Sequence, residues 1–226
     1  MTLFGEPGDE VGSKKPGPLA PLAERMRPAS LDEYLGQEDL LGPGRALRAA
    51  IEQGVAGSLV LFGPPGVGKT TLGLLIAKHA DLHFEPFSAV LSGVAQVRTA
   101  VKDAVARQQR DGRGTLLFVD EIHRFNKAQQ DAFLPHVERG DIVLVGATTE
   151  NPSFSINGAL LSRCRVVPLR PLVPEQLIGL VHAALADKER GLGVRELKIA
   201  DDAAVRLAAL AGGDARRALV CLEACG

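Results

Sequence analysis

Short apolar runs alternate along this chain with longer stretches in which apolar residues recur at helical spacing. Three runs, at 58–62, 115–119 and 142–147, are almost wholly apolar, as is typical of parallel strands that are covered on both faces. Helical spacing is clearest over 71–80 and 94–109. This alternation predicts an α/β domain with a parallel sheet.

Weaker signals predict the other elements of this domain. Ser30 followed by Glu33 is a capping-box pair and predicts a short helix. The pattern also predicts a helix over 44–53, a strand over 83–88, a helix over 129–138 that Pro135 interrupts or ends, and a strand over 166–169.

The pattern changes after Pro171. Residues 174–189, 201–211 and 214–224 are all predicted to be helical, with Pro or Asp start signals and no strand between them. We therefore expect three parts: a flexible Gly- and Pro-rich tail over 1–18, an α/β core over 19–170 and a small helical subdomain over 171–226.

Residues 63–70 fit the phosphate-binding pattern G-x-x-x-x-G-K-[ST] at every fixed position. A strand-like run precedes them and a helical pattern follows, which is the context that the motif requires. The loop backbone is expected to wrap a polyphosphate, Lys69 to reach its β and γ phosphates, and Thr70 to offer its hydroxyl to Mg²⁺. The predicted nucleotide-binding residues are Gly63, Pro64, Pro65, Gly66, Val67, Gly68, Lys69, Thr70 and Thr71.

Polar residues follow two of the apolar runs. Asp120 and Glu121 end the run at 115–119, where ligands bind in open α/β sheets, so Asp120 is expected to hold Mg²⁺ and Glu121 to polarise an attacking water. Thr148 ends the next run and is a candidate for orienting that water, the alternative being a turn-capping role. Tyr34 and Gly36 could form part of a slot for the nucleotide base, although plain packing is an equal alternative.

The composition excludes some classes of protein but indicates no particular function. The chain has 226 residues and a formal net charge of −1, which gives no sign of a nucleic-acid-binding protein. Three cysteines without paired spacing predict neither disulfides nor a zinc site. No apolar segment predicts a signal peptide or membrane anchor, and we expect a cytoplasmic location, nucleoid-associated if the source is bacterial.

Together these motifs resemble the AAA+ ATPases and, within them, the replication-associated recombination ATPases. The segments that carry the resemblance are 22–28 with 35–37, 63–71, 120–126 with 129–135, 146–154, 160–164 and 213–219. The resemblance spans about 22–226 and implies an αβα core with a five-stranded parallel sheet followed by a helical lid.

Carried over residue by residue, the resemblance implies Thr148 as sensor 1, Arg163 as an arginine finger that acts on a neighbouring subunit's ATP, and Arg216 as sensor 2. It also implies a DNA-stimulated ATPase that acts at replication forks, with DNA and replication or single-strand-binding proteins as partners. Members of that family continue into a C-terminal region that mediates oligomer formation, and this region is expected to be missing here.

Two alternatives remain open at the level of sequence. One is a P-loop kinase, although no acceptor site is evident. The other is a nucleotide-dependent interaction module with little hydrolysis.

Basic residues are locally in excess in one part of the predicted core. They are Arg98, Lys102, Arg107, Arg110 and Arg113, followed by Arg124 and Lys127. We hypothesise that some of them contact DNA phosphates, and the alternative is a solvated surface.

Overall fold

The computed structural model describes residues 17, 19–89 and 93–225, which form two compact units. The described part of the first unit is Ala50–Phe62, 73–89 and 93–167, and that of the second is 17, 19–49, Gly63–Leu72 and 168–225. Apart from Gly17, the predicted tail lies outside the described residues. Within the described ranges, no helix combines the length and the apolar character that a membrane crossing requires.

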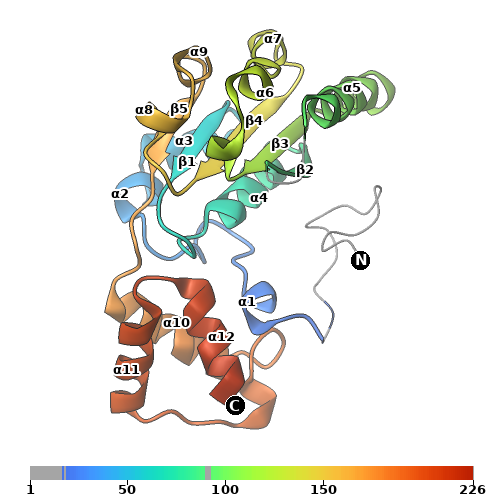
Figure 1. The fold of residues 1–226 in the computed structure, drawn as a ribbon. Helices are drawn as coiled ribbons and strands as arrows, with labels where there is room; N and C mark the ends of the chain where they lie inside the picture. The colour runs from blue at the N-terminus through green and yellow to red at the C-terminus, as the bar shows by residue number, and fades with distance from the viewer. Residues whose placement is uncertain (1–16, 18, 90–92, 226) are drawn as a thin grey trace. The chain divides into compact units, whose positions relative to one another are not determined.

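The first unit is built on a five-stranded parallel sheet with the strand order β2-β3-β4-β1-β5 (Figure 1). The strands are β1 (Leu59–Phe62), β2 (His83–Ser88), β3 (Thr115–Asp120), β4 (Val143–Thr148) and β5 (Arg165–Pro168). In β3 every residue before Asp120 is buried, as the apolar run predicts. Because β3, β4 and β1 are neighbours, their carboxyl ends lie at one edge of the sheet.

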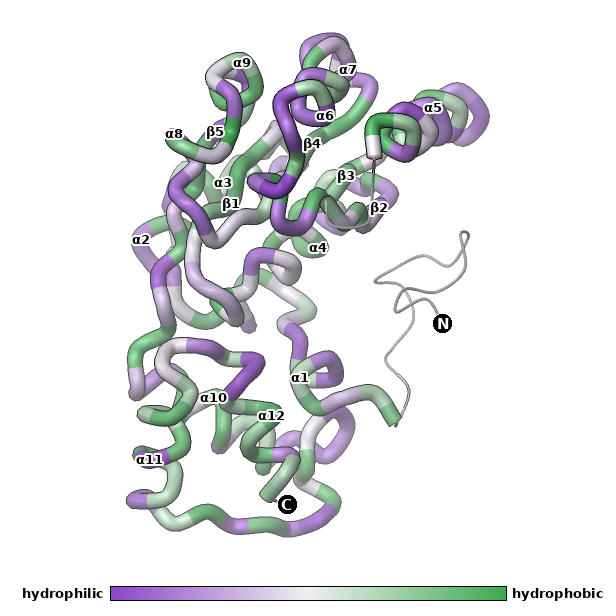
Figure 2. The backbone as a smooth tube through the Cα atoms, viewed as in Figure 1, coloured by the Kyte–Doolittle hydropathy of each residue, from purple (hydrophilic) through white to green (hydrophobic). Residues whose placement is uncertain are grey.

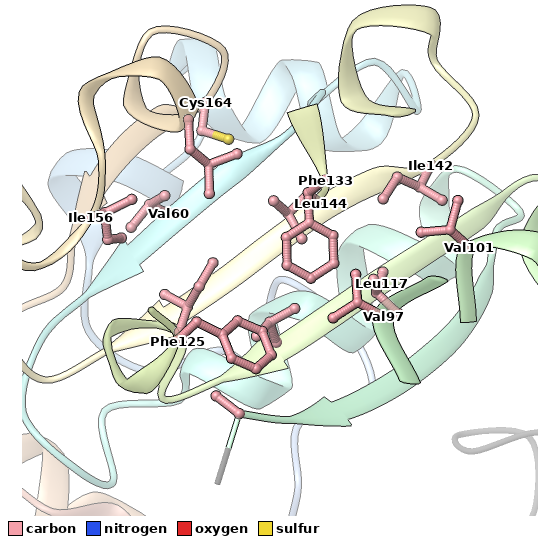
Figure 3. Packing of buried hydrophobic residues seen from close by; sticks show 14 of the residues in the cluster. Val60, Val97, Val101, Leu117, Phe125, Phe133, Ile142, Leu144, Ile156 and Cys164 are labelled. Atoms are coloured by element: carbon pink, nitrogen blue, oxygen red, sulfur yellow. The ribbon is translucent and has the colours of Figure 1, made fainter. Parts of the chain in front are cut away.

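Helices cover both faces of this sheet. They are the end of α3 (Ala46–Glu52), most of α4 (Lys69–His79), α5 (Val94–Asp111), α6 (Lys127–Asp131), α7 (Leu134–Arg139), α8 (Pro152–Ser155) and α9 (Gly158–Leu161), with the 3₁₀ helix η1 (Ile122–Arg124) after β3. On one face Leu117 packs in a core cluster with Phe125 and Phe133 (Figure 3). On the other, Phe118 stacks on Phe84, and a Cβ on Gly73 of α4 would lie 2.7 Å from the Phe118 ring.

The burial pattern of helix α5 explains the amphipathic pattern of its sequence. Bands of hydrophilic and hydrophobic residues alternate along it in Figure 2. Its buried residues are Val97, Val101 and Ala104, which recur at three- and four-residue spacing and join the same core cluster. The polar positions between them, including Arg98 and Lys102, are exposed.

The second unit combines helices from both ends of the chain with the phosphate loop. Its helices are α1 (Leu22–Arg25), α2 (Glu38–Leu41), the beginnings of α3 and α4, α10 (Pro174–Ala186), η2 (Gly193–Arg195), α11 (Asp201–Ala211) and α12 (Ala215–Cys225). Leu22 of α1 packs in one cluster with Val181 of α10 and Leu222 of α12, and all three are buried. The segment before the sheet is therefore held by residues 159 to 201 positions later in the chain, as the bond from the Leu22 N–H to the Glu223 carboxylate also shows.

The helix predicted to start at Ser30 does not form, and that prediction is wrong. The Ser30 hydroxyl accepts only a long bond of 3.4 Å from the Glu33 N–H. The Glu33 carboxylate instead accepts from Arg190 at 2.8 Å and from the Ala29 N–H at 3.2 Å. Tertiary contacts have replaced the local capping box, and the segment consists of bends.

Candidate functional site

The glycines of the phosphate loop, in the second unit, have no room for a side chain. A Cβ on Gly63 would lie 2.5 Å from the Leu169 carbonyl oxygen. At Gly66 a Cβ would collide with the Asp214 carboxylate, and the backbone there is left-handed, with φ of +71°. Larger residues at these positions would displace either the loop or the segments that pack against it.

Tyr34 packs against the backbone of the phosphate loop. Its hydroxyl donates to the Val67 carbonyl at 3.0 Å, and a Cβ on Gly68 would lie 2.5 Å from the same hydroxyl. Burial raises the pKa of Tyr34 well above its usual range, so the hydroxyl stays protonated and remains a donor. Tyr34 thus buttresses the loop backbone, while its contact with a nucleotide base stays a prediction.

Lys69 begins helix α4, as the motif predicts, and its side chain folds back over the loop. Its ammonium group donates to the carbonyls of Gly63 at 2.7 Å and Pro64 at 2.8 Å, and the residue is buried. A buried ammonium needs such acceptors or an anion. The charge is therefore already positioned inside the loop.

The last helix of the second unit starts against the same loop. The Ala215 N–H donates to the Gly66 carbonyl at 3.2 Å, and the Asp214 carboxylate caps α12 by accepting from the Arg217 N–H at 2.9 Å. Arg216 lies between these residues and is exposed. The unit therefore brings the start of α12, with Arg216, next to the middle of the phosphate loop.

Gly36 lies where the chain enters α2. Its φ is +71°, and a Cβ there would lie 2.7 Å from the Leu172 side chain. A cavity of about 200 Å³ opens beside it, lined also by Arg170 and Gln176. Gly36 thus belongs to a hollow in the second unit, and its role toward a base stays a prediction.

In the first unit, the predicted site residues gather at the carboxyl ends of adjacent strands. Asp120 is the last residue of β3 and is exposed, and Glu121 follows it. Thr148 is the last residue of β4, is fully buried, and pairs in register with Phe62, the residue that directly precedes Gly63 in the chain. Three neighbouring strands therefore end in the phosphate loop, the Asp-Glu pair and the threonine.

Glu121 has a left-handed backbone with φ of +53°, which is uncommon for a residue with a side chain. Its carboxylate lies 3.3 Å from Nδ1 of His123, and the same nitrogen lies 3.0 Å from the Thr148 hydroxyl. A strained residue held by polar neighbours is a common feature of functional sites. One imidazole, on a side chain that is 9% exposed, therefore lies against both residues for which hydrolytic roles are predicted.

Arg163 lies in the first unit just after α9. Its guanidinium pairs with Glu138 of α7, with Nε donating to the carboxylate at 2.6 Å, and Nη1 donates to the Ala159 carbonyl at 2.7 Å. About a third of the side chain is exposed. In a single copy of the chain the guanidinium is thus held at the surface by a carboxylate.

A family model decides the class of protein. The model described as the ATPase family associated with various cellular activities (AAA) matches residues 59–172, which run from β1 to just before α10. The chain belongs to the AAA family of ATPases. As expected of that family, its fold is an αβα P-loop core with a parallel sheet, followed by a helical C-terminal part.

Several relatives within the AAA proteins are similar over most of the chain. It is 53% identical over 204 residues to replication-associated recombination protein A of Escherichia coli, covering 90% of this chain and 45% of that protein. It is 43% identical over 205 residues to the ATPase WRNIP1 of Dictyostelium discoideum, covering 91% of this chain and 23% of that protein. The chain thus spans less than half the length of these relatives.

A solved structure agrees with this placement. The Thermotoga maritima RuvB Holliday junction branch migration motor superposes with a TM-score of 0.70 at 32% sequence identity, covering 88% of this chain and 64% of that one. The match therefore leaves out about 12% of this AAA chain.

Sequence analysis missed three contributors to the site: His123, Glu138 and Asp214. His123 follows Asp120 by three residues, on the 3₁₀ helix η1, which no sequence pattern predicts. Glu138 and Asp214 are separated from their partners, Arg163 and Gly66, by 25 and 148 residues. Only the tertiary structure brings those pairs together.

Proposed function

We propose that this AAA protein hydrolyses ATP with Mg²⁺ and uses the energy to remodel DNA at replication forks or recombination intermediates. The observation that carries the proposal is the order of the strands: the Asp120-Glu121 pair and Thr148 stand at the ends of the neighbouring strands β3 and β4, and the phosphate loop follows the next strand, β1, in the chain. The names of the relatives, a recombination protein and a branch migration motor, support the DNA part.

The residues present fit a magnesium nucleotide. Gly63, Gly66 and Gly68 let the loop backbone pack closely against Leu169, Asp214 and Tyr34, and the Lys69 ammonium is held by the loop carbonyls of Gly63 and Pro64. Thr70 and Asp120 supply a hydroxyl and an exposed carboxylate, the oxygen ligands that Mg²⁺ prefers. Bound Mg²⁺ would neutralise charge that develops on the phosphates.

The other steps of hydrolysis are assigned to side chains of the protein. Lys69 binds the phosphates, and Glu121 accepts a proton from the attacking water. Thr148 helps to orient that water. Arg216 lies on α12, whose first residue, Ala215, donates to the Gly66 carbonyl, and would contribute its charge to the γ-phosphate. Val67 is held through the bond from Tyr34, so the loop is pre-shaped before a nucleotide arrives.

Arg163 is proposed to act in trans on the nucleotide of a neighbouring subunit. We expect Arg163→Ala to keep ATP affinity and to lower turnover of the assembled full-length protein by roughly 10²-fold or more, because an arginine finger stabilises charge that develops only in the transition state. Steady-state phosphate release and ATP binding measure the two effects. Mixing Arg163→Ala with Lys69→Ala subunits is expected to restore part of the activity at shared interfaces.

Glu138→Ala is the matched control for this prediction, since it removes the partner that holds Arg163 in a single copy. A finger needs its guanidinium and not that carboxylate, so Glu138→Ala should retain most of the turnover. If Glu138→Ala fails as completely as Arg163→Ala, or if demonstrated mixed oligomers recover nothing, then Arg163 serves the structure of its own subunit.

The basic residues of the first unit divide into two groups. Arg107 pairs with Glu85, Arg110 with Asp111 and Arg113 with Asp81. Arg98, Lys102, Arg124 and Lys127 are exposed, and no ion pair involves them within residues 17, 19–89 and 93–225. Charges without a protein partner are the better candidates for DNA phosphates, so we assign the contact to this second group.

Phosphate contact predicts a salt-dependent affinity for DNA. For the full-length oligomer, the slope of log affinity against log salt should fall by about one unit for each contact removed in Arg98→Ala/Lys102→Ala and in Arg124→Ala/Lys127→Ala. The control Arg110→Ala/Arg113→Ala removes the same charge from residues that are already paired, and should leave the slope unchanged. Equal slopes in all three variants would place the DNA elsewhere.

Two other functions remain to be separated by experiment. A nucleotide-dependent interaction module would bind ATP without releasing phosphate, and a P-loop kinase would transfer the γ-phosphoryl group to an acceptor without releasing free phosphate. The intact set of Glu121, Thr148, Arg163 and Arg216 favours hydrolysis over both. Phosphate release with and without DNA ends identifies the hydrolase, and formation of ADP only in the presence of an added acceptor identifies a kinase.

A further inference from the structure

His123 occupies the space between the two residues proposed to act on the attacking water. Only 9% of its side chain is exposed, compared with 29% for Glu121 and 61% for Glu150, and its ring is packed at the end of β4. Nδ1 lies 3.3 Å from Glu121 Oε2 and 3.0 Å from the Thr148 hydroxyl, and Nε2 lies 3.5 Å from Glu150 Oε1. Every polar atom of the ring therefore faces a residue at this strand end.

The two carboxylates around the ring indicate which nitrogen carries the proton. A carboxylate can only accept, and Glu121 Oε2 lies 3.3 Å from Nδ1, whereas Glu150 Oε1 lies farther from Nε2, at 3.5 Å, on a side chain that is 61% exposed to water. The Thr148 hydroxyl accepts from the Glu150 N–H at 3.0 Å, and its hydrogen can go to the Glu150 carbonyl at 3.3 Å, which leaves the oxygen able to accept from Nδ1 at 3.0 Å. We therefore assign the hydrogen to Nδ1, between Glu121 and Thr148.

The backbone holds the ring in this place. Ile122, between Glu121 and His123, is fully buried, and a Cβ on Gly146 of β4 would lie 2.8 Å from its side chain. The absence of a side chain at Gly146 therefore lets the turn after β3 lie directly on β4. This close approach, together with the left-handed backbone of Glu121, sets the direction of both the carboxylate and the imidazole.

We propose that His123 is a positioning residue for hydrolysis, whose Nδ1–H orients the Glu121 carboxylate and couples it to Thr148. The proposal rests on the proposed ATP hydrolysis and adds to it a residue to which sequence reasoning gave no role. It predicts that the site needs a hydrogen-bond donor at the position of Nδ1, and that the other atoms of the side chain matter less.

Two substitutions separate this role from packing. The side-chain nitrogen of Asn is as many bonds from Cβ as Nδ1 is, whereas that of Gln corresponds to Nε2. We expect His123→Ala and His123→Gln to lower kcat by roughly 10- to 100-fold with KM for ATP changed less than about threefold, because a misplaced catalytic group affects turnover more than binding. His123→Asn should recover kcat to within about threefold of the parent protein.

A double-variant cycle tests the link to Glu121. In the Glu121→Gln background, His123→Ala should lower kcat further by less than about twofold, because the group that it positions is gone. If Asn and Gln behave alike, if His123→Ala turns over ATP at the parental rate, or if the two losses are additive, then His123 does not position Glu121.

A measurement that needs no turnover keeps this inference separate from the proposed function. In protein labelled with ¹⁵N-histidine, the ring nitrogen shifts of His123, assigned by their loss in His123→Ala, report which nitrogen bears the hydrogen. We expect Nδ1–H in the parent and a change on Thr148→Val. An Nε2–H form in the parent would overturn the inference, whereas absent phosphate release with Nδ1–H intact would count against hydrolysis alone.

Discussion

Glu121→Gln is expected to reduce ATP hydrolysis by about 10²-fold or more while ATP affinity stays within about twofold of the parent. Glutamine has nearly the same shape, but its amide does not accept a proton from water at neutral pH. Asp120 and the phosphate loop are unchanged, so the nucleotide should still bind. Single-turnover phosphate release and equilibrium ATP binding measure the two quantities separately.

Glu150→Gln is the matched control for this variant. Glu150 is a second carboxylate near His123, at 3.5 Å from Nε2, but it is 61% exposed and follows Thr148 by two residues. Its substitution should lower hydrolysis by less than about threefold. Parental hydrolysis in Glu121→Gln, or an equal loss in Glu150→Gln, would show that the catalytic carboxylate has been assigned wrongly.

Lys69→Ala is expected to weaken ATP binding by about 10²-fold or more, because the substitution removes the one ammonium group held inside the phosphate loop. The Gly63 and Pro64 carbonyls also lose their donor, which leaves the loop less favourable for an anion. Isothermal titration with ATP measures the loss, and thermal melting without nucleotide shows whether the fold is kept.

Lys78→Ala provides the comparison, since Lys78 is exposed in the last turn of the same helix. Removing that charge should leave ATP affinity within about twofold, because it lies about two helical turns from the loop. Equal affinity losses in the two variants would indicate a general effect of charge or helix stability, and the phosphate role of Lys69 would be contradicted.

Most elements of the fold were predictable because one local signal dominates each of them. β2 and α11 have the predicted bounds of 83–88 and 201–211, and α4 begins at Lys69 as the phosphate motif requires. The helix predicted over 129–138 is two helices, because Pro135 lies in the first turn of α7, where a missing N–H costs nothing. Local chemistry is sufficient where no distant residue competes with it.

Contacts with distant residues explain why the helix predicted at Ser30 does not form. At Glu33 the favourable partner is Arg190, 157 residues away, and no local rule contains it. The residues around the phosphate loop were also unpredictable, because they are distant in the chain: Tyr34 packs against Gly68, and Asp214 packs against Gly66. The sequence indicates candidate residues for the chemistry, whose roles stay predictions, but it does not indicate which side chains shape and hold them.

Phosphate release from ATP by the full-length protein, measured with and without DNA ends and with Glu121→Gln as the blank, tests the central claim most directly. We predict Mg²⁺-dependent release that rises when DNA ends are added and falls to the blank in Glu121→Gln. ATP binding without release under either condition, or phosphate transfer only to an added acceptor, would contradict an ATP-hydrolysing DNA remodeller.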